Sequence, residues 1–73
     1  MSKLPRLSGR ECVKALEAAG FYVSGQTGSH IQIRRDEPKK KVTVPNHKEL
    51  DKGTLRAIIR QADLTVDEFI ALL

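Results

Sequence analysis

The sequence predicts an α+β fold in which two helices and a short third helix cover one face of a small antiparallel sheet. Three observations lead to this prediction. Helix-capping patterns precede apolar residues at helical spacing near both ends of the chain. Three runs between residues 21 and 44 alternate apolar and polar residues, as strands with one buried face do. Short turns with glycine, proline or charged residues separate these runs, so neighbouring strands are expected to pair antiparallel.

The first helix is predicted to begin after Ser8. Ser8 and Glu11 have the spacing of a capping box, and Leu7 and Cys12 have the spacing of a hydrophobic staple. Gly20 is expected to end the helix in a left-handed conformation. Cys12 is the only cysteine, so an internal disulfide is excluded and a packing role in a reducing compartment is expected. The expected inward stripe is Cys12, Val13, Leu16 and Ala19.

The three alternating runs are expected to form the sheet. In the first run, Phe21 and Val23 would face the helices, whereas Gln26 would face away from them. Gly28 can adopt a positive φ, which suits the turn between the first two strands. Pro38 has no amide hydrogen and is expected to end the pairing of the next two strands. The predicted strands are residues 21–26, 30–35 and 41–44.

The last part of the chain predicts two more helices. Asp51 caps the first of them, with Leu50 and Leu55 as a staple, and Thr65 and Glu68 form a second capping box. The resulting order is helix, three strands, helix and short helix, which is the order of a double-stranded-RNA-binding domain. The side chains that the short helix is expected to bury are Phe69, Ile70 and Leu73.

Length and hydropathy predict one domain spanning residues 1–73. The chain has 73 residues, of which 40% are hydrophobic, so it suffices for one small core and no second one. No apolar run approaches the roughly 18 residues of a membrane span, and the first residues lack a signal-peptide pattern. A cytoplasmic protein without membrane association is therefore expected.

Charge is distributed unevenly along the chain. Residues 20–60 carry nine Lys or Arg against four Asp or Glu, whereas residues 61–73 carry three acids and no base. A basic middle beside an acidic tail predicts an anion-binding face. Aromatic residues make up only 4% of the chain, so a platform for stacking several bases is not expected. The candidate RNA contacts are Arg34, Lys41, Lys48, Lys52 and Arg56.

His30 is the main candidate for chemistry. Because side chains alternate along a strand, His30 should lie on the polar face, opposite Ile31 and Ile33. A histidine near neutral pH can both accept and donate protons, and RNA supplies its own nucleophile, the 2′-hydroxyl. The alternative is a solvated histidine at a strand end. For His47, in the loop before the Asp51 helix, three roles remain open: a second acid–base group, a phosphate contact, or a structural hydrogen bond.

Other catalytic chemistries lack suitable residues. The carboxylates are scattered singly, without the spacing of metal ligands, so no metal site and no cofactor are expected. Cys12 lies on an apolar helix stripe, and no serine has triad-like partners. The sequence therefore favours metal-independent cleavage of RNA over hydrolysis at a metal centre.

The sequence also resembles the HicA-type toxins, which are the mRNA interferases of HicA-HicB toxin-antitoxin pairs. Gly28-Ser29-His30, Val44-Pro45-Asn46-His47 and the helix at residues 52–64 carry the likeness, which extends over residues 7–73. The resemblance implies a double-stranded-RNA-binding-like fold and a metal-independent endoribonuclease that cleaves mRNA. It implies that His30 is catalytic and that Gly28 and Ser29 shape its turn. A HicB-like antitoxin would cover His30, so we expect a monomer when alone and a hetero-oligomer with the antitoxin.

Two positions depart from the family pattern. Asp63 stands at the helix end where glycine is expected, and Gln26-Thr27 lacks the basic residue often found before the Gly-Ser-His triplet. The first departure concerns only a helix cap. The second concerns the phosphate contacts around His30.

Two other classes of protein are alternatives. A noncatalytic RNA-binding module would lay the first hairpin turn and the Lys52 helix along duplex RNA. A DNA-binding helix-turn-helix would use the last helix for recognition. Residues 66–73 include Asp67 and Glu68 and no base, so this helix would repel the duplex and the second alternative fails.

Overall fold

The computed structural model describes residues 3–73 and confirms the predicted α+β architecture. The strands form one antiparallel sheet in the order β1-β2-β3. The element order is helix, three strands, helix and short helix, as the sequence predicts. The elements are α1 (Gly9–Glu17), β1 (Tyr22–Thr27), β2 (His30–Asp36), β3 (Lys39–Pro45), α2 (Lys52–Gln61) and α3 (Val66–Ile70).

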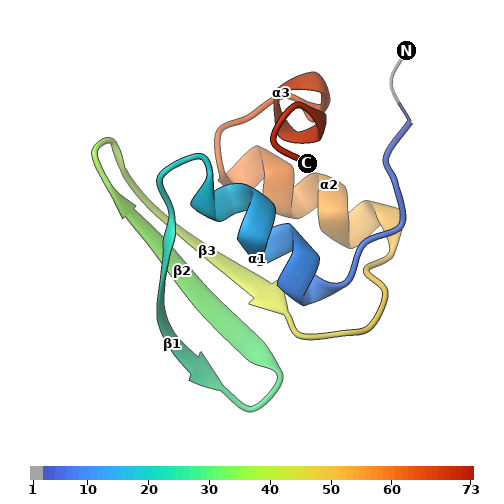
Figure 1. Cartoon of the computed structure of the whole chain (residues 1–73). Helices are drawn as coiled ribbons and strands as arrows, with labels where there is room; N and C mark the ends of the chain where they lie inside the picture. The colour runs from blue at the N-terminus through green and yellow to red at the C-terminus, as the bar shows by residue number, and fades with distance from the viewer. Residues whose placement is uncertain (1–2) are drawn as a thin grey trace.

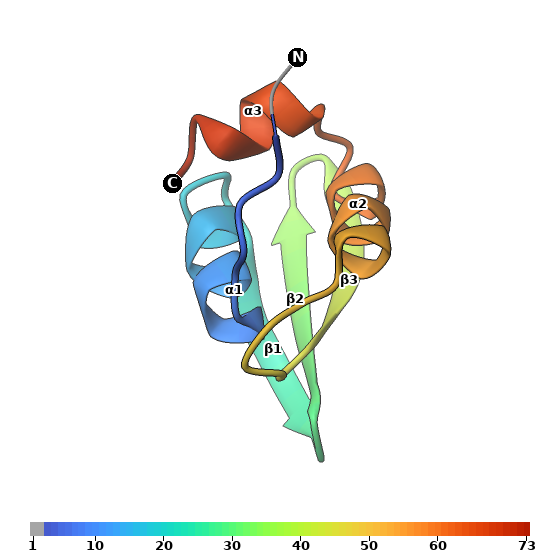
Figure 2. The same cartoon turned by 90° about the vertical axis from the view of Figure 1, so that its right-hand side faces the viewer.

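The molecule has a helical layer and a sheet layer. Helices α1 and α2 lie side by side over one face of the sheet, and α3 lies across the end of this layer (Figures 1 and 2). The β1–β2 turn lies at the opposite end of the molecule from α3 and extends beyond the helices (Figure 2). No described element covers the other face of the sheet, which we call the outer face. We call the helix-covered face the inner face.

The core lies between the two layers. Cys12 is completely buried there, and burial raises the pKa of its thiol to about 12. This thiol therefore stays protonated and packs as a small apolar group, as the sequence predicts. No described helix is long and apolar enough to cross a bilayer. The largest side chains that are almost completely buried are Phe69, Leu16, Ile33, Leu55, Val42 and Val44.

Three capped helix starts are confirmed. The Ser8 hydroxyl accepts from the Glu11 amide at 3.1 Å, and the Glu11 carboxylate accepts from the Ser8 amide at 2.9 Å. The second capping box, at Thr65 and Glu68, has the same two bonds at 3.1 and 2.8 Å. Between them, Asp51 caps α2 by accepting from the backbone amide of Thr54 at 2.7 Å.

The two long helices end in the same way. After α1, Gly20 adopts a φ of +97°, and the next amide donates back to the Leu16 carbonyl at 3.2 Å. After α2, Asp63 adopts a φ of +63°, and the next amide donates back to the Ile59 carbonyl at 3.1 Å. Both ends have the hydrogen bonds of a Schellman motif. Asp63 thus occupies the left-handed position at which the family pattern led us to expect glycine.

The predicted facing of β1 is wrong at Gln26. Val23 pairs with Ile33, but Gly25 pairs with Gln32, so Ser24 is an extra residue in the strand. This bulge inverts the alternation and places Gln26 opposite Ile31, on the inner face. Val23 lies on the inner face as predicted, yet it is 47% exposed because β1 is an edge strand.

Two further expectations are wrong. Pro38 does not end the pairing of β2 and β3, which continues to Asp36 and Lys39. Pro38 sits within the two-residue turn itself, in a cis peptide with Glu37, where the ladder requires no amide donor. At the C-terminus Leu73 is 55% exposed rather than buried, and Leu72 packs against the core instead.

Candidate functional site

The predicted site begins at the turn between β1 and β2. Gly28 has a φ of +59°, and Ser29 does not share this positive value, which is the pattern of a type II′ hairpin turn. Residues that carry a side chain rarely adopt such a φ, so glycine suits this position. The Gln26 side-chain amide donates to the Gly28 carbonyl at 3.1 Å and ties the turn to β1. The turn is therefore well defined although its residues are exposed.

His30 follows this turn as the first residue of β2. It pairs with Thr27 on one side and with Pro45 on the other. Because Ile31 and Ile33 are buried on the inner face, His30 lies on the outer face. Its side chain is exposed, and within residues 3–73 its imidazole has no hydrogen-bond partner. Both ring nitrogens are thus accessible to a ligand.

The loop after β3 holds this turn in place. The Asn46 amide donates to the Ser29 carbonyl at 2.6 Å, which joins the loop to the His30 turn. The Gly9 amide donates to the His47 carbonyl at 2.8 Å and joins the same loop to the start of α1. Gly9 is buried, and a Cβ added to it would overlap the carbonyl of Pro45. Helix α1, the loop and the His30 turn therefore form one connected unit.

Sequence reasoning did not identify Gly9 and Asn46 as supports of the site. Their partners lie far along the chain, and no local pattern predicts such contacts. A glycine at the first position of a helix, where it costs helix stability, is the one signal that could have drawn attention to Gly9.

His47 lies in the exposed loop between β3 and α2. The amide of Thr54 at the α2 cap is the main cause that lowers the pKa of Asp51, and the His47 charge lowers it further. His47 is therefore close to the start of α2, as the sequence predicts. His47 also lies two residues after Pro45, and Pro45 pairs with His30 in the sheet.

The predicted RNA contacts fall into two groups. Arg34 and Lys41 pair directly across β2 and β3. They lie on the outer face, because their neighbours Ile33 and Val42 are buried on the inner one. His30 therefore shares its face with two cations. Lys48, in the loop near His47, is exposed.

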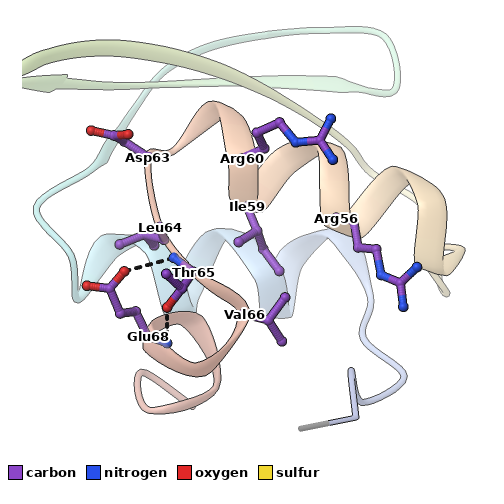
Figure 3. Close-up of a pocket in the computed structure, with 8 residues that line it drawn as sticks. All are labelled: Arg56, Ile59, Arg60, Asp63, Leu64, Thr65, Val66 and Glu68. Atoms are coloured by element: carbon purple, nitrogen blue, oxygen red, sulfur yellow. Dashed lines mark hydrogen bonds between the residues drawn. The ribbon is translucent and has the colours of Figure 1, made fainter. Parts of the chain in front are cut away.

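Lys52 and Arg56 form the second group, on the exposed side of α2 within the helical layer. Arg56 and Arg60 line a groove of about 410 Å³ between α2 and α3, together with apolar residues of the connection (Figure 3). This groove lies on the helical side of the molecule, away from the outer face that carries His30. The structure therefore does not bring the five predicted basic contacts together on one surface.

The acidic side chains do not gather around His30. Within residues 3–73 no three His, Cys, Asp or Glu side chains cluster closely enough to hold a metal ion. Tyr22, opposite Arg34 on the outer face, donates its hydroxyl to the Asp36 carboxylate at 3.0 Å, and this bond raises the pKa of Tyr22. Asp36 is at the end of β2 farthest from His30. The immediate neighbours of His30 in the sheet are thus uncharged.

Comparison with protein-family models gives a match over residues 9–64, to the family described as the HicA toxin of bacterial toxin-antitoxin systems. The chain belongs to this family. It is therefore the toxin of a toxin-antitoxin system, and a protein of this family has an antitoxin as its partner. The match includes the whole sheet, α2 and both histidines of this HicA-type chain. None of the curated proteins compared with the chain matches it.

Proposed function

We propose that this HicA-type toxin is an endoribonuclease that cleaves mRNA without a metal ion and uses His30 as its acid–base group. The observation that supports it best is the position of His30. Its imidazole has no hydrogen-bond partner within residues 3–73, and it lies on the face that also carries Arg34 and Lys41. An imidazole suits proton transfer at a phosphate, and cations further along the same face can hold the RNA strand.

The proposed reaction is an attack within one RNA strand. Neutral His30 accepts the proton of a 2′-hydroxyl, and the 2′-oxygen forms a bond to the adjacent phosphorus. The bond between phosphorus and the 5′-oxygen then breaks, which leaves a 2′,3′-cyclic phosphate and a 5′-hydroxyl. Arg34 and Lys41 lie four residues further along the outer face, so they bind a neighbouring phosphate of the same strand and hold the RNA in place. DNA has no 2′-hydroxyl and would not react.

The leaving 5′-oxygen requires a proton. His47 follows the pairing partner of His30 by two residues and is exposed, so it is the candidate donor in this region. If His47 donates this proton, His47→Ala should remove the alkaline limb of the pH–rate profile while RNA binding persists. If water donates it, the shape of that profile should not change.

The experiment for metal independence is cleavage in the presence of excess chelator. Purified protein should cut single-stranded RNA at the same rate with and without chelator, and the products should carry the two ends named above. A DNA oligonucleotide of the same sequence is the control and should remain intact. Loss of all RNA cleavage on chelation, or cleavage of the DNA, would contradict the metal-free reaction.

We also propose that a HicB-like antitoxin covers the outer face and His30. The described cations of this face include Lys39, Arg34 and Lys41, so an acidic partner would complement it. Hydrogen exchange of the complex should show protection at the His30 turn and along β2 and β3. Protection confined to α3 would contradict this position of the antitoxin.

The exposed cations of α2 favour a second candidate function, noncatalytic RNA binding. Lys52 and Arg56 are exposed on α2, and the β1–β2 turn extends beyond the helices (Figure 2). Helix α2 and this turn could therefore contact one RNA duplex together. Replacing Lys52 and Arg56 with Ala should reduce the salt dependence of binding, because each phosphate contact contributes about −0.7 (single strands) to about −0.9 (duplexes) to the log–log slope. Tight binding of duplex RNA without cleavage of any RNA would favour this second function.

A further inference from the structure

A shallow basin lies on the outer face and begins at Gln32, two residues after His30. Its volume is about 660 Å³, and the residues that line it are Ser24, Gln32, Arg34, Lys41, Thr43 and Gln61. Five of them come from the sheet, and Gln61 comes from the last turn of α2, which lies along β3. None carries a negative charge, so the basin suits a polar or anionic ligand.

Strand pairing arranges the outer face in four rows, of which the last, Asp36 with Lys39, lies farthest from His30. The first row holds His30, and the second holds Gln32 with Gly25 and Thr43 as its neighbours. The third row holds Arg34 and Lys41. Alternate residues of a strand are about 6.6 Å apart. The uncharged Gln32 row therefore lies about 6.6 Å from the His30 row and about 6.6 Å from the row of Arg34 and Lys41.

The middle row has free hydrogen-bonding groups. The side-chain amide of Gln32 and the hydroxyl of Thr43 have no hydrogen-bond partner in the described part of the chain. Ser24 donates its hydroxyl to the Gln32 carbonyl at 3.3 Å, which leaves the Gln32 side chain unused. An amide offers a donor and an acceptor side by side, which matches the edge of a nucleobase.

The missing side chain at Gly25 leaves space next to this amide. A Cβ at Gly25 would lie 3.4 Å from Oε1 of Gln32, so the amide extends along the open strand backbone. A larger side chain at this position would occupy the space that a flat ligand needs. Gln32 itself is half-buried on the central strand, so its position is better defined than that of a loop residue.

From this arrangement we propose that Gln32 and Thr43 form a nucleobase-recognition subsite that selects a nucleotide beside the scissile phosphate. The inference rests on the proposed RNA cleavage. With the scissile phosphate at His30 and a neighbouring phosphate at Arg34 and Lys41, the base between them lies over the Gln32 row. Adenine is the expected base, because its N6 and N7 pair with a side-chain amide and are accessible in a single strand.

The test is the base preference of cleavage. A pool of single-stranded RNA with randomised positions is digested by the parent and by Gln32→Ala, and the product ends are sequenced. The parent should favour adenine at one position beside the cut, and Gln32→Ala should reduce this preference roughly 5-fold to 150-fold. Arg34→Ala should slow cleavage of all sequences alike with the preference unchanged, since it contacts phosphate. Lys14→Ala, on the exposed side of α1, is the control and should behave as the parent.

Binding provides an independent measurement. In the His30→Ala background, two RNA oligonucleotides that differ only in adenine or cytosine at the preferred position should bind with different affinities. Adding Gln32→Ala should reduce their affinity ratio to about 1. Thermal unfolding of each variant is the control that checks whether the fold is retained.

Three outcomes would overturn the subsite. The first is a parent that cleaves without base preference, and the second is a Gln32→Ala protein that keeps the parental preference. The third is a Gln32→Ala protein that loses only antitoxin affinity, in which case the row is a protein interface. If the parent neither cuts nor binds RNA, the proposed RNA cleavage fails together with the subsite. If only the subsite is wrong, the parent still cleaves RNA.

Discussion

The two faces of β2 differ in what they contribute to the molecule. On the inner face Ile31 and Ile33 are 4% and 0% exposed and pack beneath the helices. On the outer face His30 is exposed, and Gln32 and Arg34 are half-buried without a covering element in the described part of the chain. Adjacent positions of one strand thus contribute to stability on one side and are available for ligands on the other. Substitutions on the two faces should therefore separate stability from activity.

The largest stability effect is expected on the inner face. Ile33→Ala removes a completely buried side chain from the central strand, and it should lower the free energy of unfolding by about 2–5 kcal/mol. Gln32→Ala, one residue away on the outer face, should change it by no more than about 0.5 kcal/mol. Urea denaturation of both variants measures the difference. Equal losses would show that the two faces do not differ as described.

Gly9→Ala should have the next largest effect. The added Cβ would overlap the Pro45 carbonyl, and a backbone group cannot move aside as a flexible side chain can. We expect a loss of about 1–3 kcal/mol in the free energy of unfolding and reduced RNA cleavage, because Gly9 supports the loop behind the His30 turn. Urea denaturation and a cleavage assay measure the two effects.

Gly53→Ala is the matched control for Gly9→Ala. An added Cβ at Gly53 meets Asp51 Oδ1 only at 3.6 Å, which is an ordinary contact. Because alanine favours a helix over glycine, stability should stay the same or rise by up to about 1 kcal/mol. Stability losses of the same size in both variants would show that the close approach of Gly9 to Pro45 is not the cause.

Asp63→Gly tests an exposed position that nevertheless affects stability. Asp63 has a φ of +63°, in the left-handed region that glycine adopts without strain. Relief of this strain, offset in part by the greater freedom of glycine in the unfolded chain, should stabilise the protein by about 0.5–1 kcal/mol. Calorimetry should record a rise in Tm of about 2–8 °C. A lower Tm would mean that the Asp63 side chain itself stabilises the end of α2.

The smallest effect concerns the cap of α2 and its pH dependence. The Thr54 amide holds the pKa of Asp51 below its ordinary value of 3.8. A carboxylate with a depressed pKa stabilises the folded state above the unfolded pKa, and this contribution is lost as the pH falls through the folded pKa. Asp51→Asn keeps an acceptor oxygen but cannot titrate. Urea titrations at about pH 6 and about pH 2.5 should therefore show a smaller acid-induced loss in Asp51→Asn than in the parent.

Local patterns predicted most of the fold. The spacing of Ser8 and Glu11 located the start of α1, and the alternation around Ile31 placed His30 on the outer face. The bulge at Ser24 was not predicted, although Gly25 within the strand is a signal for one, because a glycine does not specify which neighbouring residue is extra. Leu73 was expected in the core because helical spacing cannot tell which of two neighbouring leucines meets it; Leu72 does so.

The candidate site was predicted only in part. The Gly28 turn and the position of His30 follow from residues close together in the sequence. The support from Gly9 and Asn46, and the row formed by Gln32, Gly25 and Thr43, depend on contacts between distant segments. Such contacts follow from strand register and helix packing, which a single sequence does not specify.

The most direct test of the account compares His30→Ala with the parent. His30 is exposed on the outer face, so its loss should change the free energy of unfolding by no more than about 0.5 kcal/mol. RNA cleavage should fall by roughly 10² or more, the usual contribution of a positioned acid or base, whereas RNA binding should fall much less. A folded His30→Ala protein that cleaves RNA at nearly the parental rate would contradict the central claim that His30 performs the chemistry.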